Sequence, residues 1–539
     1  VELYDKFFRN AFPRTTEKLG IVYTPVEIVD FILHSVNEML QEHFGQSLGS
    51  RGVHIMDPFT GTGTFITRLL QSGLIAPEEL EHKYRNEIHA NEIVLLAYYI
   101  AAINIEAVYQ GEAKKNEYVP FEGICLTDTF QMYEGDDELA LYMPDNSERR
   151  TRQKELDIRV IVGNPPYSVG QETVDDNNEN VVYLQLDGRI RDTYAARTSS
   201  SLKRKLYDSY IRAIRWASDR IGDAGIVAFV TNAGWVDGNA ADGMRACLAE
   251  EFTDLYVFHL RGNQRTSGER SRKEGGKVFG TGSRAPIAIS VFVKNPDAAE
   301  HGRIFFHDIG DYLDQKQKLV IIRDFGAVKG IDRTNAWVRI TPDENNDWLK
   351  QRDASFGNFI KIGDKKHKVS PIVFETYSLG MTTGRDAWSY NSSERKLRQN
   401  MKQLIATYNA DRERASSFQG KTEDALTFDK TKISWTVNLK KDASRNRPLK
   451  LSDGRTIESL YRPFAKQWLF MSRRLIERPG QLASLFPSSG EGNLLIVLPG
   501  LSSAGRGTRR PLRRPVLRPP APRRDHRCRA GAFPVGLSG

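Results

Sequence analysis

The stretch Ile161-Val162-Gly163-Asn164-Pro165-Pro166-Tyr167 is an apolar run that ends abruptly in Asn-Pro-Pro-Tyr. Its β-branched residues are typical of a buried parallel strand, and two consecutive prolines cannot donate to a sheet ladder, so we expect the strand to end at about Asn164. In open α/β sheets, ligands bind at the carboxyl ends of the strands. The pattern therefore predicts a stiff loop at a ligand site, formed by Asn164, Pro165, Pro166 and Tyr167.

The polar and aromatic groups of this loop suit a planar substrate that carries an amine. The side-chain oxygen of Asn164 and the carbonyl of Pro165 can each accept a hydrogen bond from an NH2 group, while the ring of Tyr167 stacks on the plane. Two acceptors keep the lone pair of the nitrogen available for attack. On this stretch alone, an ordinary Asn-Pro turn capped by an aromatic ring is an equal alternative.

A second strand, expected over 53–57, leads into a glycine-containing turn and then a helix that opens at about Thr64. Glycines let the backbone approach a ligand closely, and a helix N-terminus offers unpaired N–H groups. No Lys follows the second glycine, so the turn is not a Walker loop, and the GxGxxG dinucleotide motif is missing. The turn indicates a ligand other than a nucleoside triphosphate, with a plain strand-to-helix turn as the alternative; its candidate binding residues are Asp57, Pro58, Gly61, Thr62 and Gly63.

Two more carboxylates follow predicted strands. Glu92 ends the strand-like segment 87–92, where it is placed to accept both ribose hydroxyls of an adenosyl ligand. A carboxylate favoured by the dipole of the next helix is an equally good interpretation of Glu92. Asp128 can receive an adenine amine beside Phe130, although an ordinary loop Asp is the simpler interpretation. Upstream, an amphipathic helix is expected from Val26, with Thr24 as its N-cap and Pro25 at its first position.

Strands and helices alternate after the Asn-Pro-Pro-Tyr loop. Helices are expected over 201–220 and 243–251, and strands over 224–231 and 253–260. Two further strands, 285–293 and 303–308, are expected to close the sheet as an antiparallel edge pair. This alternation predicts an α/β fold with a doubly wound, mostly parallel sheet.

The character of the chain changes at about residue 311, where charge rises and the clear alternation is lost. We expect a second domain of α+β type there, with a long charged helix over 392–417 and a short strand that starts at Tyr461. The predicted organisation is a helical lead-in, a sheet domain, a second domain and an Arg/Pro-rich tail, at 1–50, 51–310, 311–500 and 501–539.

Length and composition set the class of protein. A chain of 539 residues is too long for one ordinary core, and 40% hydrophobic with 27% charged residues describes a globular protein. No apolar run reaches the length of a membrane span, so we expect no membrane partner and a cytoplasmic location. The three cysteines are far apart and form no Cys/His cluster, which predicts neither a metal site nor a disulfide framework.

Charge is distributed unevenly along the chain. The net charge is +9, and residues 501–539 alone hold ten Arg and one Asp, so the first 500 residues balance at 67 basic and 67 acidic side chains. Any nucleic-acid surface in the body must therefore come from local charge separation. The segment 261–277 carries six basic residues; a mobile loop that contacts phosphates and a solvated surface loop are both open. Segment 171–180 is a candidate lid, and the tail is either a disordered arm or a frame-shifted end.

Taken in order, these motifs resemble those of γ-type N6-adenine DNA methyltransferases, in which the cofactor motifs precede the catalytic one. The residues that carry the resemblance are Tyr23-Thr24-Pro25, Asp57 to Gly63, Glu92, Asp128 and Asn164 to Tyr167. A closer resemblance is to the methyltransferase and target-recognition part of single-polypeptide, ATP-dependent restriction-modification enzymes of type ISP, through 183–194, 207–216 and 461–464. Family members carry an upstream nuclease and helicase-like region. This chain has no GxxxxGK[ST] and starts at Val1, so we expect that region to lie outside it.

The resemblance implies a Rossmann-like fold that uses S-adenosylmethionine, and double-stranded DNA as partner. Asp57, Gly61 and Gly63 would lie under the methionine part of the cofactor, and Tyr23, Thr24 and Pro25 would close over it. Glu92 would bind the ribose and Asp128 the adenine. Asn164, Pro165 and Tyr167 would hold a flipped adenine for methylation at N6. Cytosine-N4, RNA or protein-glutamine methylation, or a catalytically inactive DNA-specificity module, remain the alternatives.

Overall fold

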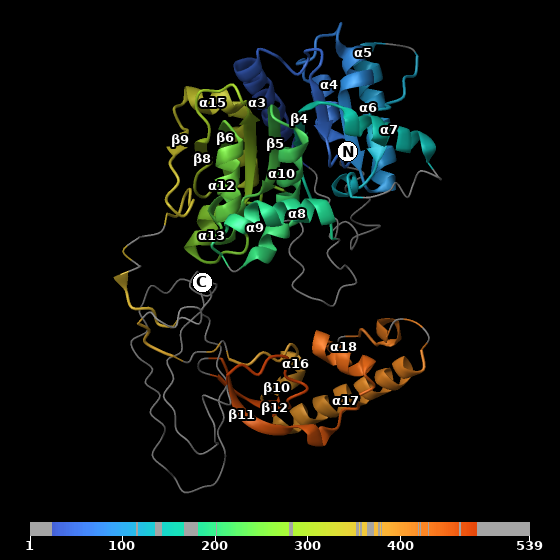
Figure 1. Cartoon of the computed structure of the whole chain (residues 1–539), viewed down its shortest axis with the longest axis vertical. Helices are drawn as coiled ribbons and strands as arrows, with labels where there is room; N and C mark the ends of the chain where they lie inside the picture. The colour runs from blue at the N-terminus through green and yellow to red at the C-terminus, as the bar shows by residue number, and fades with distance from the viewer. Residues whose placement is uncertain are drawn as a thin grey trace. The chain divides into compact units, whose positions relative to one another are not determined.

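The computed structural model describes residues 24–481, with internal gaps of which the longest are 135–142, 167–181 and 364–370 (Figure 1). The described residues fall into two compact units that divide between residues 353 and 354. No helix in the described part is long and apolar enough to cross a membrane. The candidate lid, the Arg/Pro-rich tail and the first 23 residues lie outside the described residues.

A nine-stranded sheet forms the centre of the first unit, in the order β3-β2-β1-β4-β5-β7-β6-β8-β9. Its strands are β1 (His54–Asp57), β2 (Ile88–Glu92), β3 (Ile124–Leu126), β4 (Ile158–Gly163), β5 (Gly225–Asn232), β6 (Asp254–Arg261), β7 (Ile287–Lys294), β8 (Arg303–Asp308) and β9 (Val338–Ile340). Pairing is parallel from β3 across to β5, while β7 runs antiparallel to both of its neighbours. The expected doubly wound, mostly parallel sheet is confirmed.

Helices cover this sheet in two groups (Figure 1). One group contains α3, α4, α6, α14 and α15, and the other contains α7, α8, α9, α10 and α12. Bounds of the helices in the first unit are α3 (Val26–Phe44), α4 (Thr64–Gln71), α5 (Leu80–His82), α6 (Leu95–Ala113), α7 (Pro144–Glu155), α8 (Leu184–Asp192), α9 (Tyr194–Arg197), α10 (Ser209–Arg220), α11 (Gly234–Asp237), α12 (Asp242–Glu251), α13 (Glu269–Glu274), α14 (Gln315–Phe325) and α15 (Val328–Arg333). A single helix was expected over 201–220, but the α-helix α10 covers only the second part of that range.

Strand β4 is buried because both faces of the sheet are covered. Ile158, Val160 and Ile161 have no exposed surface, as the continuous apolar run of the sequence predicts. The strand ends at Gly163, immediately before the two prolines. Residues 161–166 thus lie in the middle of the sheet, at and just beyond the carboxyl end of a central strand.

The expected antiparallel pairing of the strands at 285–293 and 303–308 is wrong. β7 is inserted between β5 and β6, and β8 pairs in parallel with β6. β7 is apolar on both faces, with seven of its eight residues buried, so it is stable only in the interior of the sheet. β9 takes the edge position instead, antiparallel to β8.

The first unit extends beyond the boundary that we expected at residue 311, because α14 and α15 both pack on α3. Ile322, Val328 and Ile331 are buried in the same core as the sheet. The rise in charge after 311 therefore reflects the solvated face of α14 and not the end of the compact unit.

The second unit contains a small sheet and two main helices around its own core. Its elements are α16 (Asp386–Ser389), β10 (Tyr390–Asn391), α17 (Glu394–Ser416), α18 (Val437–Ser444), β11 (Arg455–Arg462) and β12 (Ala465–Met471). Leu397, Met401 and Leu404 are fully buried on one face of α17, so the charged helix expected over 392–417 is confirmed. Tyr461 lies near the end of β11 instead of starting a strand.

Candidate active site at the carboxyl edge of the sheet

The parallel register brings the predicted site residues to one edge of the sheet. Asp57 ends β1, Glu92 ends β2 and Asn164 follows β4. Because β1 pairs in parallel with both β2 and β4, these three residues emerge on the same side. The sequence motifs, up to 107 positions apart from Asp57 to Asn164, therefore converge because of the strand order.

Asp57 presents a buried carboxylate of which only one oxygen is hydrogen-bonded. Oδ1 accepts from the backbone N–H of Phe59 at 3.1 Å, whereas Oδ2 is buried with no hydrogen-bond partner among the described residues. Burial raises the pKa of Asp57 to about 8, the N–H of Phe59 opposes this shift, and the negative charge of Glu92 adds to it. A carboxylate in this state is ready to pair with a cationic or hydrogen-bond-donating ligand.

Gly163 makes room for that carboxylate. A Cβ atom at this position would lie 2.9 Å from Oδ1 of Asp57, closer than real Cβ contacts allow. The last residue of β4 therefore has to be glycine for the end of β1 to keep its carboxylate against it.

The turn after β1 has the backbone that its two glycines allow. Gly61 has φ +57° and Gly63 has φ +86°, both in the left-handed region that favours glycine. Gly63 is the N-cap of α4, and a side chain there would press on Ile105. At Gly61 an added Cβ would meet nothing within 4 Å, so the turn borders open space at this point.

Glu92 holds this turn from the neighbouring strand. Oε2 accepts from the N–H of Gly61 and Oε1 from the N–H of Val94, each at 2.8 Å. Burial raises its pKa to about 7, and the backbone hydrogen bonds oppose this shift. The carboxylate thus organises the backbone of the turn and of the start of α6 from the tip of β2, and ribose binding by Glu92 stays a prediction.

Asp128 lies beside an aromatic wall. Its Oδ1 accepts from the N–H of Phe130 and its Oδ2 from the hydroxyl of Tyr183, both at 2.9 Å. The ring of Phe130 packs 5.5 Å from Phe59 and 5.3 Å from Tyr183, the latter edge-on. Burial raises the pKa of Asp128, and the bond from Tyr183 opposes this shift. An aromatic wall beside a carboxylate suits a planar heterocycle.

Tyr183 was missed as a site residue. In the sequence Tyr183 only precedes an amphipathic helix and belongs to a stretch that carries the family resemblance, and no motif pairs it with Asp128. The ring is also covered by the guanidinium of Arg212, 5.1 Å from its centre, and Arg212 is in turn held by Asp187. A single aromatic residue ahead of α8 was the available signal, and it gave no indication of this contact.

Asn164 makes the contact that connects the two ends of the candidate site. Its Nδ2 donates to Oγ1 of Thr24 at 2.9 Å, across 140 positions of sequence. The expected role of Thr24 as an N-cap is therefore wrong. Pro25 occupies the N-cap position and its carbonyl accepts from Ile28 and Val29, while the Thr24 hydroxyl is used by Asn164.

Of the remaining predicted residues, some are described by the structure and others are not. Pro165 is buried and Pro166 half-buried, and the carbonyl of Pro58 accepts from Oγ1 of Thr129 at 2.6 Å. The carbonyl of Thr62 accepts from Asn104 at 2.9 Å. Tyr23 and Tyr167 lie outside the described residues.

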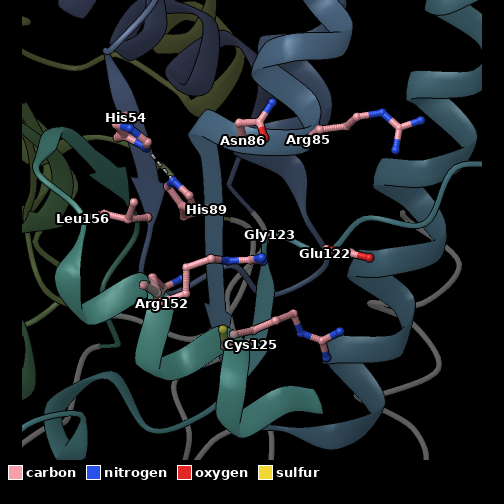
Figure 2. Close-up of a pocket in the computed structure, with 11 residues that line it drawn as sticks. His54, Arg85, Asn86, His89, Glu122, Gly123, Cys125, Arg152 and Leu156 are labelled. Atoms are coloured by element: carbon pink, nitrogen blue, oxygen red, sulfur yellow. Dashed lines mark hydrogen bonds between the residues drawn. The ribbon is translucent and has the colours of Figure 1, made fainter.

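A cavity elsewhere in the first unit is separate from this site (Figure 2). It has a volume of about 280 Å³, and its lining includes His54 and His89, whose Nδ1 and Nε2 atoms are 3.0 Å apart. His54 begins β1 and Leu156 precedes β4, so the cavity lies toward the amino ends of the strands. Burial lowers the pKa of His89 to about 3. The candidate site and this cavity therefore occupy opposite ends of the same strands.

Comparison with known proteins identifies both parts of the chain. Residues 1–205 match the family described as N-6 DNA Methylase, and residues 372–509 match the Type ISP C-terminal specificity domain. No curated protein gives a match.

Three solved structures are similar over nearly the whole chain. A nuclease-deletion mutant of the Type ISP restriction-modification enzyme LlaGI, in complex with a DNA substrate mimic, is 44% identical over 92% of this chain and 40% of that one, with a TM-score of 0.83. The ATP-dependent Type ISP restriction-modification enzyme LlaBIII, bound to DNA, is 42% identical over 92% of this chain and 32% of that one, with a TM-score of 0.83. The DrdV–DNA complex is 35% identical over 90% of this chain and 47% of that one, with a TM-score of 0.80.

This chain thus spans less than half the length of each of these three proteins. The match reaches from the methylase fold through the specificity domain, and both sets of elements are present in the described residues. In its methylase and C-terminal specificity domains, the chain matches the corresponding part of the type ISP restriction-modification enzymes.

Proposed function

We propose that the chain is a site-specific DNA methyltransferase that transfers a methyl group from S-adenosylmethionine to the N6 amine of a flipped adenine, within a restriction-modification system. The observation that carries the proposal is the convergence of Asp57, Glu92 and Asn164 at one edge of the sheet. Two of these groups suit a charged adenosyl ligand, and the third suits an amine.

The residues fit S-adenosylmethionine. The unpartnered Oδ2 of Asp57 is positioned to accept from the ammonium of the methionine part, and open space borders Gly61. Glu92 would accept the ribose hydroxyls, and Asp128 the adenine amine beside Phe130. When bound, S-adenosylmethionine supplies an electrophilic methyl group on its sulfonium. Tyr23, Thr24, Pro25, Pro58, Thr62 and Gly63 complete the proposed cofactor residues.

Asn164 would hold the target amine. The hydrogen bond from its Nδ2 to Thr24 fixes the orientation of the amide, and Oδ1 would accept from the amine together with the carbonyl of Pro165. Pro166 keeps this loop stiff, and Tyr167 would stack on the base. The amine nitrogen would bond to the methyl carbon that the cofactor supplies as the sulfur–carbon bond breaks, and its proton would leave afterwards to solvent, so that the chain needs no base before attack.

DNA is favoured over RNA or a protein glutamine because the second unit matches a specificity domain and the similar structures were solved with DNA. Cytosine-N4 has the same exocyclic amine chemistry and is the second candidate. An upstream nuclease and helicase-like region is the proposed partner in the same polypeptide, and a DNA substrate implies a cytoplasmic location.

The test is methyl transfer from labelled S-adenosylmethionine to plasmid DNA by the purified chain, followed by mapping of the modified bases. We expect label on adenine N6 within a defined sequence. Label on cytosine would show that the target amine is cytosine N4 instead of adenine N6. Sequence-specific DNA binding without any transfer would show an inactive specificity module and refute the proposed activity.

A further inference from the structure

The connection between β6 and β7, residues 262–286, emerges at the same edge of the sheet as Asn164. β6 runs parallel to β5, because β7 is antiparallel to both, and β5 is parallel to β4. Arg261 therefore ends β6 on the side where Gly163 ends β4. A mobile loop that contacts phosphates and a solvated surface loop were the two interpretations of 261–277; the described part of the connection is held at several points.

A buried lysine anchors the returning half of the connection. Lys318, on α14, is fully buried. Its Nζ donates to the carbonyls of Glu274 and Gly276, at 2.9 and 2.8 Å. Gly276 also donates to the carbonyl of Leu313 at 2.9 Å. Gly275, at φ +69°, would place an added Cβ only 2.1 Å from that same carbonyl. These contacts hold the backbone without using any exposed side chain.

The two limbs of the connection are also tied to each other and to the sheet. The N–H of Gln264 donates to the carbonyl of Arg284 at 2.9 Å, and Ala233, just after β5, donates to the carbonyl of Pro286 at 2.8 Å. Arg261 donates from Nε to Asp308 at 2.6 Å. The connection is thus a built surface that lies against the end of β5.

Its exposed cations are only partly neutralised. Arg272 is paired with Glu269 at 3.3 Å and Lys273 with Asp311 at 3.2 Å. Among the residues that the structure describes, the exposed side chains of Arg265 and Arg270 have no carboxylate partner. Arg284 is also exposed, and within the described part of the chain its guanidinium donates to a backbone carbonyl, that of Gln264 at 3.3 Å, and to no carboxylate. Three guanidinium groups therefore remain available on a backbone that is fixed in place.

We propose that Arg265, Arg270 and Arg284 contact the phosphate backbone of duplex DNA next to the flipped base. This proposal rests on the proposed methyltransferase function, which makes duplex DNA the ligand of this surface. A base held at Asn164 brings its flanking phosphates to this edge of the sheet, and guanidinium groups bind phosphate oxygens through two hydrogen bonds. Because the backbone is already ordered, binding costs little conformational entropy. Phosphate contacts carry no sequence information, so this surface positions the duplex while the specificity domain selects it.

The experiment measures DNA affinity of the purified chain by fluorescence anisotropy over a range of salt concentrations. The test variant combines Arg265→Gln and Arg270→Gln. The matched control combines Arg152→Gln and Arg333→Gln, two exposed residues at the ends of α7 and α15 with the same total change in charge. Affinity for DNA decreases as salt rises, and each lost phosphate contact is expected to reduce the magnitude of the slope of log affinity against log salt by about 1. We therefore expect the magnitude of the slope to be smaller by about 2 in the test variant. The control should keep the wild-type slope.

The loss in affinity should be equal for duplexes with and without the target sequence, and binding of labelled S-adenosylmethionine should be unchanged. A wild-type slope in the test variant, or an equal loss in the control, would overturn the phosphate assignment while leaving the proposed methyltransferase intact. Wild-type chain that neither binds nor methylates DNA would overturn the proposed function itself, and the phosphate contact with it.

Discussion

Two buried groups at opposite edges of the large sheet, Lys83 and Asp57, differ in whether the fold supplies a partner for each polar atom. At the amino edge the charges are paired: Lys83, which is fully buried, donates to Glu87 at 2.7 Å and to the carbonyls of Ser50 and Val53. At the carboxyl edge Asp57 keeps a buried oxygen without a partner among the described residues.

The pKa directions follow the same division. Burial alone would raise the pKa of Asp254, at the amino end of β6, but hydrogen bonds from His43 and Arg303 outweigh it and the pKa is lowered. The pKa values of Asp57 and Glu92 are raised instead, because burial is compensated only by backbone N–H groups. Lys83 and Asp254 thus have charged partners within the fold, whereas Asp57 has a buried oxygen without a partner among the described residues, which the proposed cofactor would supply.

The largest expected effect is at the amino edge. Lys83→Met leaves the carboxylate of Glu87 buried without its ammonium partner, and removing one member of a buried pair costs about 3–5 kcal/mol. We expect the free energy of unfolding, measured by urea denaturation, to fall by this amount. The matched control is Arg85→Met, which removes an exposed pair with Glu81 at 3.1 Å and should cost less than about 1 kcal/mol. Equal losses in the two variants would contradict the larger stabilisation that we assign to the buried Lys83–Glu87 pair.

The next effect is on activity at the carboxyl edge. Asn164→Ala removes the proposed acceptor of the target amine, and we expect methyl transfer to fall by at least about 100-fold, the scale for loss of one positioned hydrogen-bonding group. Binding of S-adenosylmethionine should survive. Asn86→Ala, at the amino edge, is the control and should keep its rate. Methylation by the Asn164 variant at close to the wild-type rate would refute the assignment.

A smaller effect separates stability from ligand binding. Asp57→Asn replaces a buried, half-satisfied carboxylate by a neutral group of the same shape. We expect the ligand-free chain to gain about 1 kcal/mol of stability at pH 8, since the amide carries no charge that burial must desolvate. Affinity for S-adenosylmethionine should fall in the same variant, as measured by calorimetry. A variant that is less stable and binds the cofactor normally would show that Asp57 is purely structural.

The last effect is a pH dependence of stability at the same residue. The pKa of Asp57 rises from 3.8 to about 8 on folding, so between these values the folded state holds the extra proton. Its contribution to stability is therefore present at low pH and is lost as pH rises toward about 8. The wild-type chain should lose more stability than Asp57→Asn between pH 5 and pH 8, as measured by thermal melting. Parallel curves would contradict the raised pKa.

The sequence predicted the parts of the site that depend on strand ends. Asp57, Glu92 and Asn164 each follow an apolar segment, and the position of a ligand at the carboxyl ends of parallel strands is a property of the sheet. The contact between Thr24 and Asn164 was not predictable, because helix-capping statistics describe only local partners. Tyr183 was missed for the same reason, since its bond to Asp128 spans 55 positions.

The sequence by itself determined the local chemistry: a stiff loop after Gly163, a glycine turn after Asp57, and alternating strands and helices of an α/β fold. Only the tertiary structure decided that β7 enters the interior of the sheet, that α14 and α15 belong to the first unit, and that Arg265 and Arg270 stand on an anchored surface. The physical reason is that periodicity and turn chemistry act over a few residues, whereas strand order, burial and ion pairing are set by segments far apart in the chain.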